Sequence, residues 1–134
     1  DVVSILIGSN DAAVCMNTGR TPEMISFAEN YRCLLGRIQE KTEARLVCMG
    51  PFIFPQPLEY SRWIPIIRKI EETEQRIAGE HHALFLPLHD LLHQEAQRAG
   101  YDGITPDGIH LTWEGAGVVA RTWIREVDRA GIFS

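Results

Sequence analysis

Three short apolar runs lie at intervals along the chain, at residues 2–8 (VVSILIG), 45–50 (RLVCMG) and 83–88 (ALFLPL). The first consists mainly of β-branched and aliphatic residues and ends in a glycine, and the other two repeat this pattern. Continuous apolar runs of this length are typical of strands that are buried on both faces of a parallel sheet. We therefore expect three parallel strands at these positions.

Four other segments have the periodicity of helices. The first follows Thr21, a good N-cap, and Pro22, which suits the first helical position. The second spans about 61–79, the third about 88–99, and the fourth begins at Thr112. The expected buried faces of the first, second and fourth helices are Met24, Ala28, Tyr31, Leu35 and Ile38; Ile67, Ile70, Glu74 and Ile77; and Trp113, Ala116, Ala120, Trp123, Ile124 and Val127.

This order of strands and helices predicts an α/β doubly wound fold with a parallel sheet. Three strands make a thin sheet, and the chain starts directly with one of them. We therefore expect the sheet to continue in a part of the same domain that precedes Asp1. The chain has no internal repeats and no low-complexity linkers, so residues 1–134 are expected to belong to one domain.

Composition narrows the class of protein. Of the 134 residues, 45% are hydrophobic and 23% charged, which is ordinary for a globular domain. The net charge of −5 is spread without long runs, which argues against a nucleic-acid partner. No apolar run approaches the roughly 20 residues that a membrane-spanning helix needs. Cys15, Cys33 and Cys48 cannot all pair within one chain and match no zinc motif, so we interpret them as reduced thiols.

The first predicted strand ends in GSND at residues 8–11. Ligands of open α/β sheets bind beyond the carboxyl ends of the strands, so Asn10 lies where a site is expected. A side-chain amide there can donate a hydrogen bond to a developing oxyanion. The alternative is that Asn10 and Asp11 only form a turn.

A second candidate lies ahead of the last helix, in ITPDGIHLT at residues 104–112. It places Asp107 three residues before His110. Histidine is the usual base for a hydroxyl nucleophile, and a carboxylate nearby orients its ring. The alternative is a turn at Pro106–Gly108 followed by a surface histidine.

Together, the GSND and DGIHLT segments resemble, in this order, the third and fifth conserved blocks of the SGNH hydrolases, also called the GDSL lipase/esterase family. The resemblance covers essentially the whole chain as the C-terminal part of one SGNH domain. It implies a flavodoxin-like three-layer α/β/α fold with strand order 2-1-3-4-5, of which strands 3, 4 and 5 are present. It also implies that Asn10 is an oxyanion donor and that Asp107 and His110 belong to a Ser-His-Asp triad.

The family's nucleophile is a Ser in a Gly-Asp-Ser stretch after the first strand, and a Gly after the second strand supplies an oxyanion N–H. No Gly-Asp-Ser occurs in this chain. We therefore expect the nucleophile upstream of Asp1. Ser4, Ser9, Ser26 and Cys15 are weaker candidates to replace it.

Several other residues are candidates for substrate binding or metal binding. Gly8, Phe52 and Phe54 are candidates for substrate binding, with plain core packing as the alternative for both phenylalanines. His89 and His93 have a spacing that can hold a metal, but a solvated helix face is the favoured interpretation and no metal site is expected. The remaining interpretations are packing for Trp63, Trp113 and Trp123, and an exposed loop for Glu80, His81 and His82.

The complete protein is thus expected to be a serine esterase or acylhydrolase that needs no metal or organic cofactor. Its partner would be a small-molecule ester: an acyl ester, a lipid or an acetylated carbohydrate. The alternative is a non-catalytic fragment or degenerate family member that acts as a binding module. Self-association through the strand at residues 2–8 is also expected, and the cellular compartment stays open.

Overall fold

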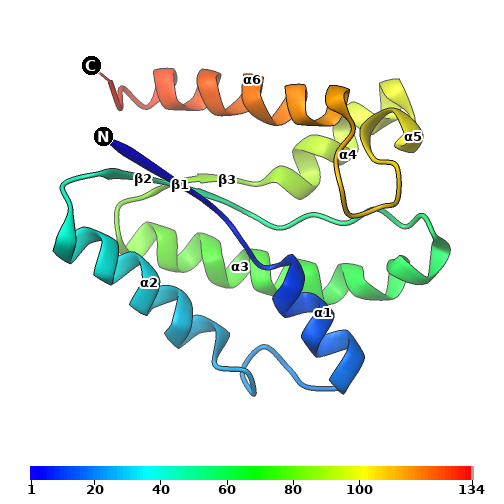
Figure 1. Ribbon diagram of the computed structural model, residues 1–134, viewed down its shortest axis with the longest axis horizontal. Coiled ribbons are helices and arrows are strands. Elements are labelled where there is room, and N and C mark those ends of the chain that lie inside the picture. Colours follow the sequence, from blue (N-terminus) through cyan, green and yellow to red (C-terminus); the bar gives the residue numbers. More distant parts are fainter. Residues whose placement is uncertain (134) are drawn as a thin grey trace.

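The computed structural model describes residues 1–133 as a three-layer α/β/α arrangement (Figure 1). A parallel sheet lies between α1, α2 and α3 on one side and α4, α5 and α6 on the other. The strands are β1 (Val2–Leu6), β2 (Arg45–Met49) and β3 (Leu84–Leu86). The helices are α1 (Ser9–Thr18), α2 (Phe27–Lys41), the 3₁₀ helix η1 (Leu58–Trp63), α3 (Ile64–Glu80), α4 (Leu88–Ala99), α5 (Tyr101–Ile104) and α6 (Trp113–Arg129). None of the helices within 1–133 is long and apolar enough to cross a membrane.

The strand order is β1-β2-β3, with every pairing parallel. Val2 lies beside Arg45 and Leu6 beside Met49, while residues 47–49 of β2 pair with 84–86 of β3. This confirms the predicted fold class and the three predicted strands, although each strand ends before its apolar run does.

Alternation along β2 divides the interior into two cores. Leu46 and Cys48 face the layer of α2 and α3, whereas Val47 and Met49 face the layer of α4 and α6. Both sets are buried, because a strand covered on both faces has no solvent side. This explains why the run at 45–50 shows no polar alternation.

The prediction misses one helix and misplaces the start of another. Helix α1, which the hydrophobic pattern does not indicate, starts directly after Gly8 and contains Asn10 in its first turn. Helix α2 starts at Phe27 rather than Pro22, because residues 22–26 form turns in which the Thr21 hydroxyl accepts a hydrogen bond from the Met24 N–H. Met24 is therefore exposed instead of lying on the buried face.

The predicted buried face of α6 is correct only in part: Val127 is buried as expected, but most of the predicted positions are exposed. Trp113 is 95% exposed and Ile124 63% exposed, whereas the helix buries Gly115, Val118, Thr122 and Val127. The reason is close packing, since a Cβ at Gly115 would lie 2.4 Å from the carbonyl oxygen of Ile104. The face of α6 that packs against Ile104 consists of small and polar residues. A prediction based on the large apolar residues therefore selected a face displaced from the buried one.

The packing interpretation of the other tryptophans holds. Trp63 packs against the core beside Tyr60, with ring centroids 5.1 Å apart. Trp123 is half-buried against the second core, and its indole N–H donates to the Ser4 hydroxyl over 2.9 Å. Among the three tryptophans, the packing interpretation is wrong for Trp113 alone.

Candidate active site

A shallow hollow lies at the carboxyl end of β1. Its volume is about 380 Å³, and its lining comes from three separate parts of the chain. The lining residues are Leu6, Ile7, Gly8, Ser9, Asn10, Asp11, Phe52 and Ile109. The tertiary structure thus brings the GSND segment beside the loop of the DGIHLT segment, about 100 residues later in the sequence.

Asp107 and His110 form a hydrogen-bonded pair on the loop before α6. Asp107 Oδ2 lies 2.6 Å from His110 Nδ1, and Oδ1 accepts the backbone N–H groups of Ile109 and His110 over 2.9 and 2.8 Å. These hydrogen bonds lower the pKa of Asp107 to about 2, and the bond from the His110 ring makes the largest contribution. The predicted contact between the carboxylate and the ring is confirmed.

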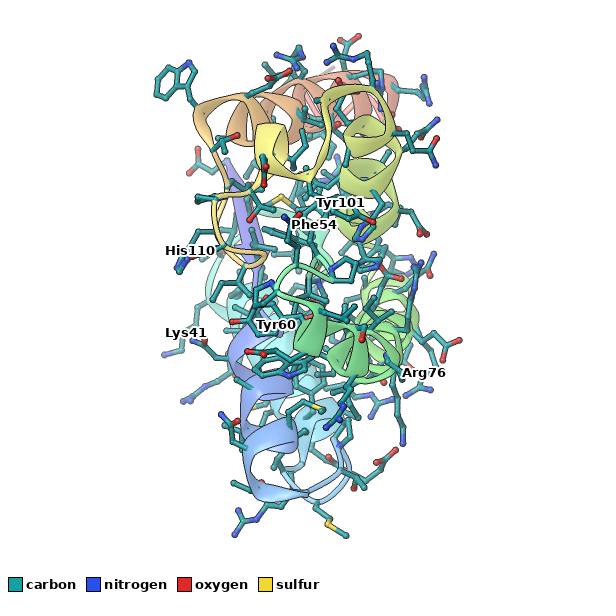
Figure 2. The ribbon with its side chains drawn as sticks, turned by 90° about the vertical axis from the view of Figure 1, so that its right-hand side faces the viewer. Lys41, Phe54, Tyr60, Arg76, Tyr101 and His110 are labelled. Atoms are coloured by element: carbon teal, nitrogen blue, oxygen red, sulfur yellow. The ribbon has the colours of Figure 1, made fainter. Side chains whose placement is uncertain are left out.

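The pair fixes which nitrogen of His110 carries the proton. An ionised carboxylate only accepts hydrogen bonds, so Nδ1 donates to Asp107. In the neutral ring, Nε2 then holds the lone pair and is the nitrogen that can accept a proton. The His110 side chain is 74% exposed, and Figure 2 shows it at the edge of the molecule, pointing away from the core.

The loop that carries this pair is held by backbone contacts. The buried Thr105 hydroxyl accepts the Gly108 N–H over 2.8 Å, and the Gly108 carbonyl accepts the Phe54 N–H over 2.9 Å. Gly108 has φ +93°, and a Cβ there would lie 2.4 Å from the Gln56 carbonyl oxygen. Only glycine fits this position. The role of Thr105 was not predicted, although a Thr two residues before Asp107 can form a side-chain hydrogen bond to a nearby backbone N–H.

The other half of the site depends on Gly8. Its φ is +120°, and a Cβ would lie 3.0 Å from Pro51 and 3.1 Å from both Glu74 and Ile70. Its carbonyl accepts the Ala12 N–H over 2.9 Å, so α1 starts immediately after the turn. Asn10 is exposed in the first turn of this helix, at the carboxyl end of β1.

The two candidate phenylalanines have different surroundings. Phe52 lines the hollow, although little of its side chain is exposed. Phe54 is fully buried, stacks on His93 and meets Tyr101 edge-on, as its central place beside Tyr101 in Figure 2 indicates. Of the two alternatives, core packing therefore applies to Phe54, which does not line this hollow.

The interpretation of His89 and His93 as a solvated helix face is wrong. His89 is 2% exposed and His93 is half-buried, because this side of α4 faces the second core. No group of three or more His, Cys, Asp or Glu side chains able to hold a metal ion occurs within residues 1–133. At the end of α3 and in the loop before β3, His81 is half-buried with its ring bonded to Gln39, while Glu80 and His82 are exposed, so the predicted exposed loop holds only in part.

A buried acid lies beneath the Gly8 turn. Glu74 is fully buried, and neither carboxyl oxygen has a hydrogen-bond partner in the described part of the chain. Burial, followed by the charges of Asp11 and Glu71, raises the pKa of Glu74 to about 9. The sequence signal was an acid on the apolar face of a predicted helix.

None of the residues weighed as replacement nucleophiles is activated. Ser4 accepts the Trp123 indole bond, and Ser26 precedes α2, away from the hollow. Ser9 lines the hollow, but no base contacts its hydroxyl among the bonds of residues 1–133. Cys15 is buried, and burial raises its thiol pKa. Within the described residues all three cysteines are free thiols.

Comparison with known proteins supports the class that this architecture suggests. The chain matches the GDSL-like Lipase/Acylhydrolase family over residues 1–118. A GDSL-like protein from Parabacteroides merdae is similar over 98% of this chain and 60% of its own, with 25% identity and a TM-score of 0.83. Axe2, an acetylxylan esterase from Geobacillus stearothermophilus, is similar over 95% and 59%, with 21% identity and a TM-score of 0.75. No curated protein matches the chain significantly.

A third structure, LAE5, an alpha/beta hydrolase enzyme from the metagenome of Lake Arreo in Spain, shares 19% identity over 93% of this chain and 58% of its own, with a TM-score of 0.78. The fold is that of an SGNH-type α/β hydrolase. The chain belongs to the GDSL-like lipase/acylhydrolase family, a family of ester hydrolases. It spans about 60% of the length of the solved structures that it resembles.

Proposed function

We propose that this chain supplies the acid, the base and one oxyanion donor of a serine ester hydrolase. Its substrate is a small-molecule ester, and its nucleophilic Ser lies in a segment upstream of residues 1–134. The observation that carries the proposal is the 2.6 Å contact between Asp107 and His110, on a loop that shares a hollow with Asn10.

The chemistry follows from the direction of the hydrogen bonds. With Nδ1 held by Asp107, Nε2 of His110 takes the proton of the attacking Ser hydroxyl and later delivers it to the leaving alcohol. Asp107, ionised down to about pH 2, stabilises the imidazolium that forms in between. Asn10 donates its side-chain amide to the oxyanion of the tetrahedral intermediate.

Solved variants of Axe2 add support. Three of them are called catalytic mutants, and they change one Ser, one Asp and one His of that protein. The Asp and the His are three positions apart, as Asp107 and His110 are here. The absence of Gly-Asp-Ser in this chain supports the upstream position of the nucleophile.

The alternative is a binding module without catalytic activity. It is favoured by the same absence of a nucleophile within the chain, and it leaves the Asp107–His110 pair as a turn contact. The two alternatives differ in whether the complete protein hydrolyses esters.

The test uses the complete protein with its upstream segment and a series of p-nitrophenyl esters from acetate to octanoate. We expect turnover that His110→Asn lowers at least about 10³-fold, as loss of a triad member does. His82→Asn is the matched control, since His82 is exposed and lies far from the loop in sequence. A fluorophosphonate probe should label a Ser outside residues 1–134 and leave the 134-residue chain unlabelled. A complete protein without turnover or labelling would favour the binding module.

A further inference from the structure

His89 is buried and His93 half-buried on α4, and the chemistry above does not use them. They face the same way on α4, with ring centroids 4.1 Å apart. The His93 ring stacks on Phe54 at 4.3 Å with an interplanar angle of 12°. The backbone N–H of Ile53 points to His89 Nδ1 over 3.3 Å. Both histidines therefore contact the same short segment, residues 53–54.

These hydrogen bonds assign the protons of both rings. A backbone N–H can only donate, so His89 Nδ1 accepts and the ring proton lies on Nε2. A carbonyl can only accept, so His93 Nδ1 carries the proton that it donates to the His89 carbonyl over 2.7 Å. The His89 ring, whose Nδ1 accepts, is therefore neutral. Burial is the main cause that lowers the pKa of each, to about 4 for His89.

The segment they contact is bonded directly to the catalytic loop. The N–H of Phe54 donates to the Gly108 carbonyl over 2.9 Å, one residue along from the N–H that His89 accepts. Gly108 follows Asp107 and has no room for a side chain against the Gln56 carbonyl. The backbones of residues 54–56 and Gly108 thus lie in direct contact, and we expect a shift of the first segment to displace the second.

We propose that His89 and His93 are positioning residues, which hold residues 53–54 against Gly108 and thereby set the place of the Asp107–His110 pair beside Asn10. The catalytic consequence rests on the proposed function, whereas the mechanical coupling does not. Neither histidine touches substrate in this proposal. Each acts through the backbone of Ile53 and Phe54.

Substitutions at His89 distinguish a hydrogen-bonding role from a space-filling role. If His89 only fills space, a Leu of similar volume replaces it. If it positions the loop, the acceptor atom matters, and His89→Asn, whose side-chain oxygen can take the place of Nδ1, keeps the function better than His89→Leu does. For His93 the stacked ring matters, so His93→Phe keeps the coupling and His93→Ala weakens it.

The first measurement is amide hydrogen exchange in the complete protein, which requires no enzymatic activity. We expect His89→Leu to speed exchange at the amides of Ile53, Phe54 and Gly108 by about 10-fold or more, relative to amides of the central strand β2. His89→Asn should restore much of the protection. Equal exchange in both variants, or acceleration spread evenly over β2 and the loop, would overturn the proposal.

The second measurement is ester hydrolysis by the same variants. Misplacement of a catalytic group lowers turnover, so we expect His89→Leu and His93→Ala to reduce kcat about 10- to 100-fold with little change in KM. His89→Asn and His93→Phe should stay near the unmodified rate. Wild-type kcat in His89→Leu and His93→Ala overturns the positioning role.

The two measurements also separate the two proposals. If the unmodified protein hydrolyses no ester, the proposed function fails, and the exchange data alone decide the coupling between α4 and the loop. If it hydrolyses esters but the loop amides do not respond to His89→Leu, the positioning role fails and the proposed function stands.

Discussion

The possible roles of Asn10 depend on its surroundings in the folded chain. In the sequence it belongs to GSND, which reads equally well as a turn. In the structure it occupies the first turn of α1 and lines the hollow that Ile109 also lines. The side-chain amide is therefore available to a ligand in that hollow, which a turn role would not require.

We predict that Asn10→Ala in the complete protein lowers kcat by roughly 10²–10³, with little effect on KM, because one oxyanion donor is lost. Steady-state kinetics on a p-nitrophenyl ester measure this effect. Asn17→Ala is the control, since Asn17 is exposed on the same helix and does not line the hollow. Unchanged kcat in Asn10→Ala would show that Asn10 is only structural.

Glu74 leads to a prediction about pH and stability. Its pKa is raised to about 9 in the folded protein, so the folded state keeps a proton that the unfolded state loses above about pH 4.5. Stability from this group is therefore complete below pH 4.5 and declines as pH rises toward 9. The steepest slope is about 1.4 kcal/mol per pH unit.

Glu74→Gln removes this titration and keeps the shape of the side chain. We expect the variant to gain thermal stability over the unmodified protein between pH 5 and pH 8, with the difference in Tm growing as pH rises. Glu72→Gln, on the exposed side of α3, is the matched control. A difference that is constant with pH would contradict the protonated state of Glu74.

Among the elements, β1 is the most exposed of the three strands. It pairs with β2 on one side only within residues 1–133, and Leu6 and Ile7 are 43% and 38% exposed. Unpaired apolar strands recruit other strands.

We predict that the 134-residue chain alone self-associates through β1. Size-exclusion chromatography with light scattering should show species larger than a monomer, increasing with concentration. Leu6→Lys places a charge on this strand and should shift the chain toward monomer. Leu58→Lys, at a 78% exposed apolar residue of η1, should not. A monomer at every concentration would contradict self-association.

At the scale of the whole molecule, the site is built from segments distant in sequence. The hollow joins residues 6–11 to Phe52 and Ile109, and the loop of Asp107 is fastened to residues 54–56. The chain accounts for about 60% of the solved structures that it resembles. In the proposed function the nucleophile comes from outside residues 1–134.

The sequence by itself determined the three strands, the parallel α/β class and the Asp107–His110 pair. Each depends on local order: a continuous apolar run marks a strand covered on both faces, and a separation of three residues lets a carboxylate meet a nearby ring. Only the tertiary structure decided the buried face of α6, the burial of His89, His93 and Glu74, and the meeting of Asn10 with the histidine loop. These features depend on close approaches at Gly8, Gly108 and Gly115, where the absence of a side chain lets distant segments come into contact. The periodicity of one segment does not indicate which distant segment it will contact.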